Sequence, residues 1–220
     1  MMIDYRIYLV TDDPSRYAGN WLENVRAAVE GGVTCVQYRD TENAPRVQYE
    51  RILKLRDALS AFKTPLIVNN DAELAKAVTA EGVHVGQNDM PVAEVRKIVG
   101  PVCEIGLSIT DISQLSALDP QSSSLNPDAF GIGPVFDARK TKADAANAMG
   151  PEGLRDVVSF LTRQECRVPF VAIGGITPAN AGAVIDAGAT GLAVVSAFSK
   201  SEDPYGVARR FAVLFDNRGL

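Results

Sequence analysis

The sequence predicts an α/β fold in which eight parallel strands alternate with helices within a single domain, residues 1–220. Short apolar runs rich in valine, isoleucine and leucine recur along the chain, mostly without alternation of apolar and polar residues. Such runs are typical of parallel sheets covered on both faces. Their starts lie roughly 17 to 40 residues apart, which leaves room for one helix between successive strands. The expected strands are RIYLVT (6–11), TCVQYR (34–39), PLIVNN (65–70), GVHVGQ (82–87), EIGLSI (104–109), AFGIGPVF (129–136), PFVAIGG (169–175) and GLAVVSA (191–197).

Helix start and stop signals fill the gaps between these runs. Capping residues or prolines stand at the beginning of most gaps, and glycine often stands at the end. The signals predict helices over 21–30 after Asn20, from Pro45 to about 62, over 72–80 after Asp71, and over 92–99 after Pro91. They further predict a short helix near Leu118 after Asp111 or Ser113, and one over 152–161 after Gly150-Pro151. The last two are a helix from Thr177-Pro178 to Gly188 and one from Asp203-Pro204 toward Leu214.

Eight strand–helix units in 220 residues indicate a closed (β/α)8 barrel, the TIM barrel, close to its minimum size. The alternative is an open doubly wound sheet, which usually has about five or six strands. The count of eight, without a second domain or a linker, favours the barrel. The longest irregular stretches are 122–127 and 137–149. The second follows a strand and holds Arg139, Lys140 and Lys142, so it is a candidate lid over a site at that end.

Composition restricts the classes of function. Apolar residues make up 46% of the chain and charged residues 22%, which suits an ordinary globular core. The net charge of −5 makes nucleic acid a poor partner. No apolar run approaches the roughly 20 residues that cross a bilayer, and the first residues lack the basic region of a signal peptide. Three distant cysteines and a single histidine argue against structural zinc and fit a reducing compartment. We therefore expect a cytoplasmic protein, and the sequence leaves a homo-oligomer open.

Polar side chains gather where the expected strands end. In a (β/α)8 barrel, catalytic residues lie on the loops after the strands, so these positions are the candidate site. Gln37 and Arg39 are two apart and leave the same face of their strand. The remaining strand-end candidates are Asn69, Asn70, Asp71, His84, Gln87, Asp89, Ser108, Thr110, Arg139, Lys140, Lys142, Gly174, Gly175 and Ser196.

These residue types suit a phosphorylated substrate and a divalent metal. Mg²⁺ binds one or two carboxylates together with substrate oxygens and water, and Asp89 with Asp71 or Asn70 could supply the protein ligands. Arg39 and the lysines at 140 and 142 could pair with phosphate oxygens. The glycine pair at 174–175 lets the backbone approach an anion closely.

Each of these residues also has a purely structural interpretation. Arg39 could form a surface pair with Asp40, and Asp71 could only cap the following helix, which is the favoured interpretation there. The side chain of His84 points opposite to those of Val83 and Val85, so it either packs in the interior or faces a substrate. Lys140 and Lys142 could be solvated loop charges.

The ordered string of motifs resembles the thiamine phosphate synthase family. The resemblance runs over nearly the whole chain, through CVQYRD, PLIVNND, GVHVGQNDMP, IGLSIT, FGIGPVF…TKADA, PFVAIGGIT and GLAVVSAF. GVHVGQND and GIGPVF…TK are fairly specific, whereas AIGGI occurs in many phosphate-binding barrels. The string is also similar to the sister thiazole tautomerases, which usually lack the histidine of GVHVGQ and carry one shortly after the serine of the fifth strand. Here that stretch reads SIT, which favours the synthase.

The resemblance implies a reaction in which a hydroxymethylpyrimidine diphosphate and a thiazole phosphate give thiamine phosphate and pyrophosphate, with Mg²⁺ on the diphosphate. It implies that Gln37, Arg39 and Asn69 hold the diphosphate substrate, and that Asp89 is a metal ligand. Ser108 and Lys142 are implied contacts of the diphosphate, so Arg39, Ser108 and Lys142 are the expected catalytic residues. Thr141 is implied to bind the thiazole phosphate substrate, and the backbone of Gly174, Gly175, Val195 and Ser196 to hold its phosphate.

Three positions depart from the family pattern. Thr41 stands where the family has a lysine, and Asn70 where it has a metal-binding aspartate. The loop after the sixth expected strand is one residue longer and reads Ala138 near the family's first threonine. All three fall on the apparatus that binds anions and metal. They leave two alternatives to the synthase: a sister enzyme acting on a thiazole or pyrimidine phosphate, and a catalytically silent paralogue that binds such a ligand.

Overall fold

The structure is a computed structural model that describes residues 2–116, 127–139, 141 and 145–219. Its strands form one closed parallel barrel in the order β1 to β8, with β8 pairing back onto β1. The predicted (β/α)8 barrel is therefore confirmed. The strands are β1 (Ile7–Val10), β2 (Cys35–Tyr38), β3 (Leu66–Asn69), β4 (Gly82–Val85), β5 (Glu104–Ile109), β6 (Ala129–Ile132), β7 (Phe170–Ile173) and β8 (Gly191–Val194).

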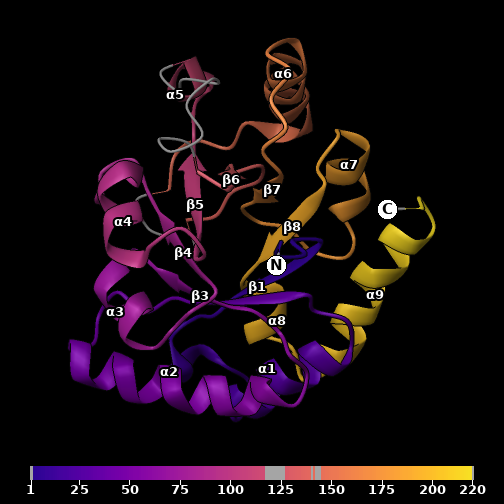
Figure 1. The fold of residues 1–220 in the computed structure, drawn as a ribbon. Coiled ribbons are helices and arrows are strands. Elements are labelled where there is room, and N and C mark those ends of the chain that lie inside the picture. Colours follow the sequence, from indigo (N-terminus) through magenta and orange to yellow (C-terminus); the bar gives the residue numbers. More distant parts are fainter. Residues whose placement is uncertain (1, 117–126, 140, 142–144, 220) are drawn as a thin grey trace.

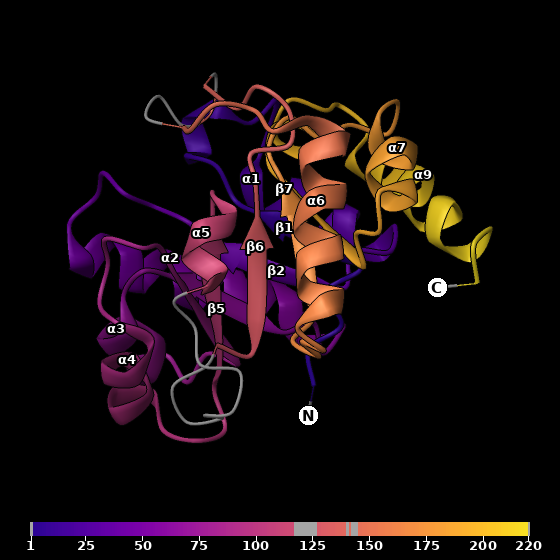
Figure 2. The same ribbon diagram turned by 90° about the horizontal axis from the view of Figure 1, so that it is seen from above.

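Helices cover the outside of this barrel, as Figures 1 and 2 show for α6 and α7 beside β6 and β7. Among the described residues, none of the helices has both the length and the apolar character that a membrane crossing requires. The helices are η1 (Pro14–Arg16), α1 (Trp21–Glu30), α2 (Pro45–Ser60), α3 (Ala72–Ala77), α4 (Val92–Val99), α5 (Ile112–Ser116), α6 (Gly150–Arg163), α7 (Ala181–Asp186), α8 (Ser196–Ser199) and α9 (Pro204–Asp216).

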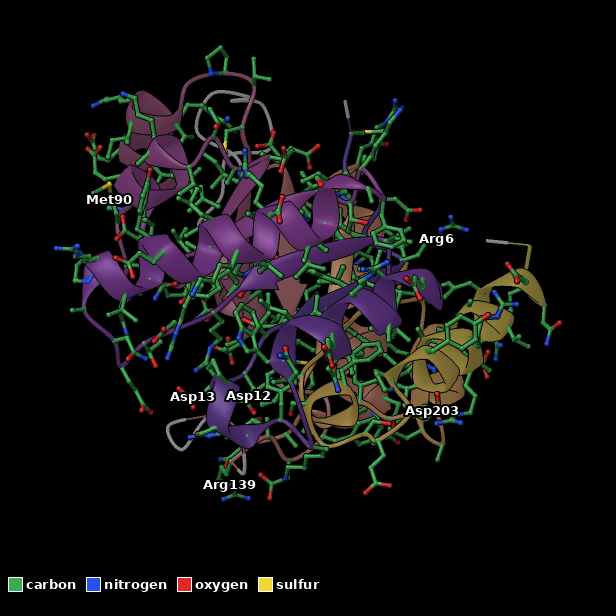
Figure 3. All side chains as sticks on the ribbon, turned by 90° about the horizontal axis from the view of Figure 1, so that it is seen from below. Arg6, Asp12, Asp13, Met90, Arg139 and Asp203 are labelled. Atoms are coloured by element: carbon green, nitrogen blue, oxygen red, sulfur yellow. The ribbon has the colours of Figure 1, made fainter. Side chains whose placement is uncertain are left out.

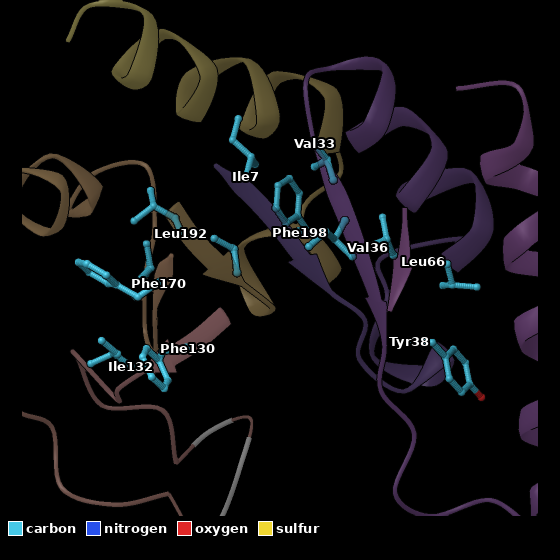
Figure 4. Close-up of a cluster of buried hydrophobic side chains, with 14 of the residues drawn as sticks. Ile7, Val33, Val36, Tyr38, Leu66, Phe130, Ile132, Phe170, Leu192 and Phe198 are labelled. Atoms are coloured by element: carbon cyan, nitrogen blue, oxygen red, sulfur yellow. The ribbon is translucent and has the colours of Figure 1, made fainter. Parts of the chain in front are cut away.

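The core has two layers because successive side chains of a strand point to opposite faces. Ile7 and Leu9 of β1 belong to the large cluster between strands and helices, where Figure 4 shows Ile7 near Val33, Val36 and Phe198. Tyr8 and Val10 belong instead to a smaller cluster inside the barrel. The second cluster forms the base on which the site is built, and its remaining members are Ile3, Cys35, Ile67, Val171 and Ala193.

Two helices differ from the expectation in ways the local backbone explains. The helix predicted from Thr177-Pro178 begins only at Ala181. The residues before it form a turn, because Asn180 accepts a hydrogen bond from the backbone N–H of Thr177 at 2.8 Å and donates one to the Gly175 carbonyl at 3.0 Å. The helix predicted to reach residue 80 ends at Ala77, since Thr79 adopts a left-handed conformation with φ 54°.

Two strands end three or more residues earlier than expected. β6 stops at Ile132 instead of 136, because Pro134 has no N–H to donate to a sheet. The expected strand over 191–197 stops at Val194, and the chain turns at once into α8, which the sequence analysis did not predict. α5 begins after Asp111 as expected, but Leu118, where it was centred, lies outside the described residues.

Candidate active site

A pocket opens at the carboxyl ends of the strands. It is lined by Tyr8, Val10, Gln37, Arg39, Asn69, His84, Ser108, Thr110, Gly131, Gly133, Pro134, Ala138, Thr141, Ala145, Ala146, Val171, Ile173, Gly174, Gly175, Ile176, Ala193, Val195 and Ser196. These residues follow or end all eight strands, which is why positions distant in sequence meet here. One end of the barrel thus collects the polar strand-end residues in a single cavity.

The pocket collects nearly all of the expected substrate-binding residues. Those that line it are Gln37, Arg39, Asn69, His84, Ser108, Thr141, Gly174, Gly175, Val195 and Ser196. That these residues bind substrate stays a prediction. Lys140 and Lys142, expected on the loop after β6, lie outside the described residues, and so does most of the centre of the candidate lid.

Gln37 and Arg39 of the second strand both face the pocket, as their spacing predicts. The buried Gln37 donates a hydrogen bond from Nε2 to the hydroxyl of Tyr8 at 2.6 Å, which fixes the direction of its amide. The backbone N–H of Arg39 donates to Thr11 Oγ1 at 2.9 Å. The Arg39 guanidinium bonds to no carboxylate in the part of the chain that the structure describes. Its charge is thus available to a bound anion.

The surface pair considered between Arg39 and Asp40 is not formed. Asp40 pairs with Arg51 Nη1 at 2.9 Å and accepts hydrogen bonds from Tyr38 and Asn43. Burial alone would raise the pKa of Asp40, but these hydrogen bonds lower it to about 2. Asp40 therefore organises the loop after β2 and leaves the neighbouring arginine to the pocket.

His84 forms part of the pocket's inner wall. Its Nε2 lies 3.0 Å from Ser108 Oγ, and its ring occupies space that neighbouring strands leave open. A Cβ at Gly131 would lie 2.9 Å from the ring's Cε1, and one at Gly106 would overlap Nδ1. His84 therefore lines the pocket and is also packed, and that it contacts a substrate stays a prediction. Burial lowers its pKa from 6.5 to about 4, with the Asp89 charge opposing that shift.

The titration of this imidazole can be measured directly, because His84 is the only histidine in the chain. We expect its proton NMR signals to titrate near pH 4 instead of near 6.5. Since the unfolded chain binds the proton first as the pH falls, the free energy of unfolding should decline between pH 6.5 and 4, by up to about 3 kcal/mol. That decline should be absent in His84→Asn. A titration near pH 6.5 would contradict the buried, neutral ring.

Asn70 and Asp89 meet at the edge of the pocket. Asn70 Nδ2 lies 3.2 Å from Asp89 Oδ1, and Asp89 Oδ2 accepts a hydrogen bond from the Gly86 N–H at 2.7 Å. Asn70 adopts φ 62°, a left-handed conformation that asparagine and aspartate tolerate better than most residues. One carboxylate and one amide oxygen, after rotation of the Asn70 amide, suit a hard cation that takes its other ligands from substrate and water. The donor set therefore fits Mg²⁺.

Asp71 has a different environment from this pair. Its Oδ1 accepts a hydrogen bond from the Leu74 N–H at 2.8 Å, so it caps α3. This is the structural interpretation favoured on the sequence. A role as an additional metal ligand stays a prediction, and within the described residues no three His, Cys, Asp or Glu side chains cluster around a common point.

Replacing Asp71 separates the two roles. Asp71→Ser keeps a capping oxygen but removes the charge, so we expect nearly unchanged unfolding and unchanged dependence of activity on Mg²⁺. Asp71→Ala should lower the free energy of unfolding by about 1 kcal/mol. Urea unfolding and Mg²⁺ titrations of both variants provide the measurement. A weaker apparent Mg²⁺ affinity in Asp71→Ser would make Asp71 a metal ligand.

The wall formed by β7 and β8 is built from backbone. Gly174 and Gly175 have φ 105° and 61°, and a Cβ on Gly175 would lie 2.7 Å from the Cβ of Phe136. Val195 and Ser196 stand where β8 turns into α8, so the first N–H groups of that turn have no acceptor within the helix. Both segments can thus present N–H groups to an anion in the pocket.

Sequence reasoning missed some residues of this site. Tyr8 and Val10 line the pocket, and the Tyr8 hydroxyl accepts the hydrogen bond from Gln37, yet neither was among the strand-end candidates. The alternation within the first strand, which points Tyr8 and Val10 inward, was the signal available.

Behind the pocket, buried Asp12 lies just after β1, beside η1 (Figure 3). It pairs with Arg16 Nη1 at 3.3 Å. Nothing local in the sequence marks Asp12 as buried.

Comparisons with known proteins give a consistent result. Residues 7–198 match the family model described as thiamine monophosphate synthase. The chain is 42% identical over 213 residues to a thiamine-phosphate synthase of Chloroflexus aurantiacus, covering 97% of this chain and 94% of that one. It is 39% identical over 217 residues to one from Desulfitobacterium hafniense strain Y51, covering 99% and 100%. Among solved structures, thiamine phosphate pyrophosphorylase from Pyrococcus furiosus superposes with a TM-score of 0.81 at 30% identity, covering 98% of both chains.

Proposed function

Because the chain belongs to the thiamine monophosphate synthase family, we propose that it joins a hydroxymethylpyrimidine diphosphate to a thiazole phosphate, giving thiamine phosphate and pyrophosphate. The bond between the pyrimidine methylene carbon and the diphosphate oxygen breaks, and a bond from that carbon to the thiazole nitrogen forms. The enzyme is thus a transferase. The sister-enzyme and silent-binder alternatives have no comparable support among the relatives.

One observation carries this proposal: two different kinds of anion-binding group face the same pocket. Arg39, whose guanidinium has no carboxylate partner among the described residues, follows β2, while the backbone of Gly174, Gly175, Val195 and Ser196 forms the wall at β7 and β8. A substrate with a diphosphate and a second substrate with a monophosphate need two such regions. Their placement on one cavity allows both substrates to be held together.

The residues near β2 and β5 suit departure of pyrophosphate. Negative charge grows on the leaving oxygen as the carbon–oxygen bond breaks, and groups fixed in advance stabilise it more than water does. Arg39 can pair with the diphosphate oxygens, and the Ser108 hydroxyl can donate to them. Lys142 is proposed to act with them. A neutral His84 avoids placing a positive charge beside the pyrimidine as its methylene carbon becomes electron-poor.

Asp89 and Asn70 are the proposed ligands of Mg²⁺, which when bound would neutralise part of the diphosphate charge. The Gly86 N–H orients the Asp89 carboxylate by a hydrogen bond, and Asn70 would contribute a neutral oxygen to the metal. With one carboxylate fewer than the family pattern, the proposed site binds the metal chiefly together with the diphosphate. Apparent Mg²⁺ affinity should therefore increase when the diphosphate substrate is present.

Capture of the electron-poor carbon needs no strong nucleophile from the protein. The thiazole nitrogen attacks it, so the protein's contribution is to hold that nitrogen in line. The backbone wall at β7 and β8 would fix the phosphate end of the thiazole, and Thr141 would contact the same substrate. Gln37 and Asn69, on the neighbouring strands, would orient the pyrimidine.

An assay for pyrophosphate release tests the function. With both substrates and Mg²⁺ present, we expect stoichiometric formation of pyrophosphate and thiamine phosphate, and almost none after the metal is chelated. Omitting the thiazole phosphate should abolish formation of thiamine phosphate. Binding of both substrates without turnover would support the silent-binder alternative and would overturn the synthase.

The glycine wall provides a further prediction. Gly175→Ala would place a methyl group 2.7 Å from the Phe136 Cβ on a residue with φ 61°. We expect the KM for the thiazole phosphate to rise about tenfold or more and the free energy of unfolding to fall by about 1–3 kcal/mol. Gly100→Ala is the matched control for backbone strain, since Gly100 has φ 80° in open space at the end of α4. Its KM values should stay unchanged.

The proposed location is the cytoplasm. Cys35, Cys103 and Cys166 are all free thiols in the structure, as a reducing compartment permits. A homo-oligomer stays a prediction, which sedimentation of the purified protein tests.

A further inference from the structure

A pair of hydrogen bonds from Asn24 holds the far end of α8. Asn24 lies on α1 and is 8% exposed. Its Nδ2 donates to the Phe198 carbonyl at 3.1 Å and to the Ser201 carbonyl at 3.3 Å. Because both partners are acceptors, only an NH2 group serves here, and the orientation of the amide is fixed. Helix α1 is thus tied through one side chain to the segment that follows the pocket wall.

The other half of this amide is left without a partner. Asn24 Oδ1 is buried and accepts no hydrogen bond from any residue that the structure describes. An unpaired buried acceptor destabilises the folded state. The presence of asparagine at position 24 therefore needs an explanation other than the stability of the fold. The contact of Nδ2 with α8 is the one feature of Asn24 that offers such an explanation.

The segment held by Asn24 has little stability of its own. α8 is four residues long, and so short a helix depends on tertiary contacts. Backbone hydrogen bonds connect the last residues of α8 to the residue before it. The N–H groups of Phe198 and Ser199 donate to the Val195 carbonyl at 3.0 and 3.2 Å. Fixing the carbonyl of Phe198 therefore also fixes Val195, which lines the pocket.

A second buried contact supports the same segment from the β1 side. The Ser199 hydroxyl lies 3.5 Å from Asp12 Oδ2, and both side chains are nearly inaccessible. Phe198 packs against Phe211 of α9 with ring centroids 5.9 Å apart. These contacts anchor α8 by packing and by one long side-chain hydrogen bond, and the backbone N–H of Ala18 donates to the Ser199 carbonyl at 2.9 Å. Asn24 adds two side-chain hydrogen bonds, which join the carbonyl of Phe198 in α8 to the carbonyl of Ser201 just beyond it.

We propose that Asn24 is a positioning residue for the thiazole phosphate, acting through α8 on the backbone N–H groups at Val195 and Ser196. The inference rests on the proposed function. Asn24 touches no substrate, since it lies behind the wall. Replacing Asn24 should therefore lower the affinity for the thiazole phosphate and leave the affinity for the diphosphate substrate near β2 unchanged.

Asn24→Asp is the most informative variant, because aspartate has nearly the same shape as asparagine. Its carboxylate cannot donate to the two carbonyl oxygens and repels them. We expect the KM for the thiazole phosphate to rise about tenfold or more, while the KM for the diphosphate substrate stays within about twofold. Asn24→Ala should act in the same direction and replaces Asn24→Asp if that variant does not fold. Calorimetric titration with the thiazole phosphate alone should show the same loss of affinity in both variants.

Asn20→Ala is the matched control. Asn20 is the N-cap of the same helix, where its Oδ1 accepts hydrogen bonds from the N–H groups of Leu22 and Glu23 at 3.0 and 3.3 Å, so its side-chain hydrogen bonds stay within the first turn of α1. This variant should lower the melting temperature and change neither KM. If the Asn24 variants behave like Asn20→Ala, or raise both KM values alike, Asn24 is only structural and the inference is overturned. A wild-type protein without turnover would overturn the proposed function instead, and the titration would still decide on Asn24.

Discussion

Asp89→Ala is expected to reduce kcat for thiamine phosphate formation by about a thousandfold or more. Asp89 supplies the carboxylate of the proposed metal site, and its partner Asn70 is neutral. Losing charge stabilisation at a departing pyrophosphate raises the activation free energy by several kcal/mol, and each 1.36 kcal/mol corresponds to about a factor of ten. Steady-state rates over a range of Mg²⁺ concentrations give the measurement.

Asn70→Asp is the complementary variant. It adds an anionic ligand to a hard cation, so we expect half-maximal activity at a lower Mg²⁺ concentration. Glu94, exposed on α4 and paired with Lys97, offers a control carboxylate away from the pocket, and Glu94→Ala should leave the Mg²⁺ dependence unchanged. Full activity in Asp89→Ala would remove Asp89 from the metal site.

Arg39→Ala is expected to lower kcat/KM for the diphosphate substrate by about a hundredfold or more. The Arg39 guanidinium faces the pocket, and Thr41 stands where the family pattern has a second cation. Since residue 41 is a threonine, no lysine at that position helps Arg39 to neutralise the diphosphate. Arg39→Lys should recover only part of the rate, because a lysine cannot pair with two phosphate oxygens in the same plane.

Thr41→Lys should act in the opposite direction. An ammonium beside a diphosphate in a partly closed site should stabilise it by roughly 1–3 kcal/mol. A lower KM alone would mean that the lysine binds ground state and transition state alike, whereas a higher kcat would mean that it favours departing pyrophosphate. Arg46→Ala, at an exposed arginine of α2, is the control for loss of surface charge. Tolerance of Arg39→Ala together with no effect of Thr41→Lys would argue against a diphosphate at this strand end.

The strands and the pocket-facing residues follow from local patterns. Each expected strand begins within one residue of the observed one, because parallel strands buried on both faces leave compact apolar runs. Gln37 and Arg39 face the pocket because side chains alternate along a strand. The glycine pair at 174–175, expected to let the backbone approach an anion closely, lines the pocket and has positive φ values.

Features that depend on distant partners could not be predicted in this way. α8 is too short to have a periodic pattern, and its position depends on α1 and α9. Asn24 looked like any polar residue of an amphipathic helix, because its carbonyl partners lie 174 and 177 residues away in the sequence. Asp40 next to Arg39 suggested a pair, but the fold brings Arg51 to it instead.

His84 also reduces the room that the pocket leaves beside β5 and β6. Its ring fills the space left by Gly106 and Gly131 on the two following strands, and His84 and Gly131 both line the pocket. A single substitution such as His84→Ala would enlarge the cavity by the volume of an imidazole and leave the backbone wall of β7 and β8, the proposed phosphate site, unchanged. The size of the pocket and the recognition of phosphate are thus separable properties. We therefore expect that a change at position 84 alone would admit a larger ligand while the proposed phosphate site keeps its geometry.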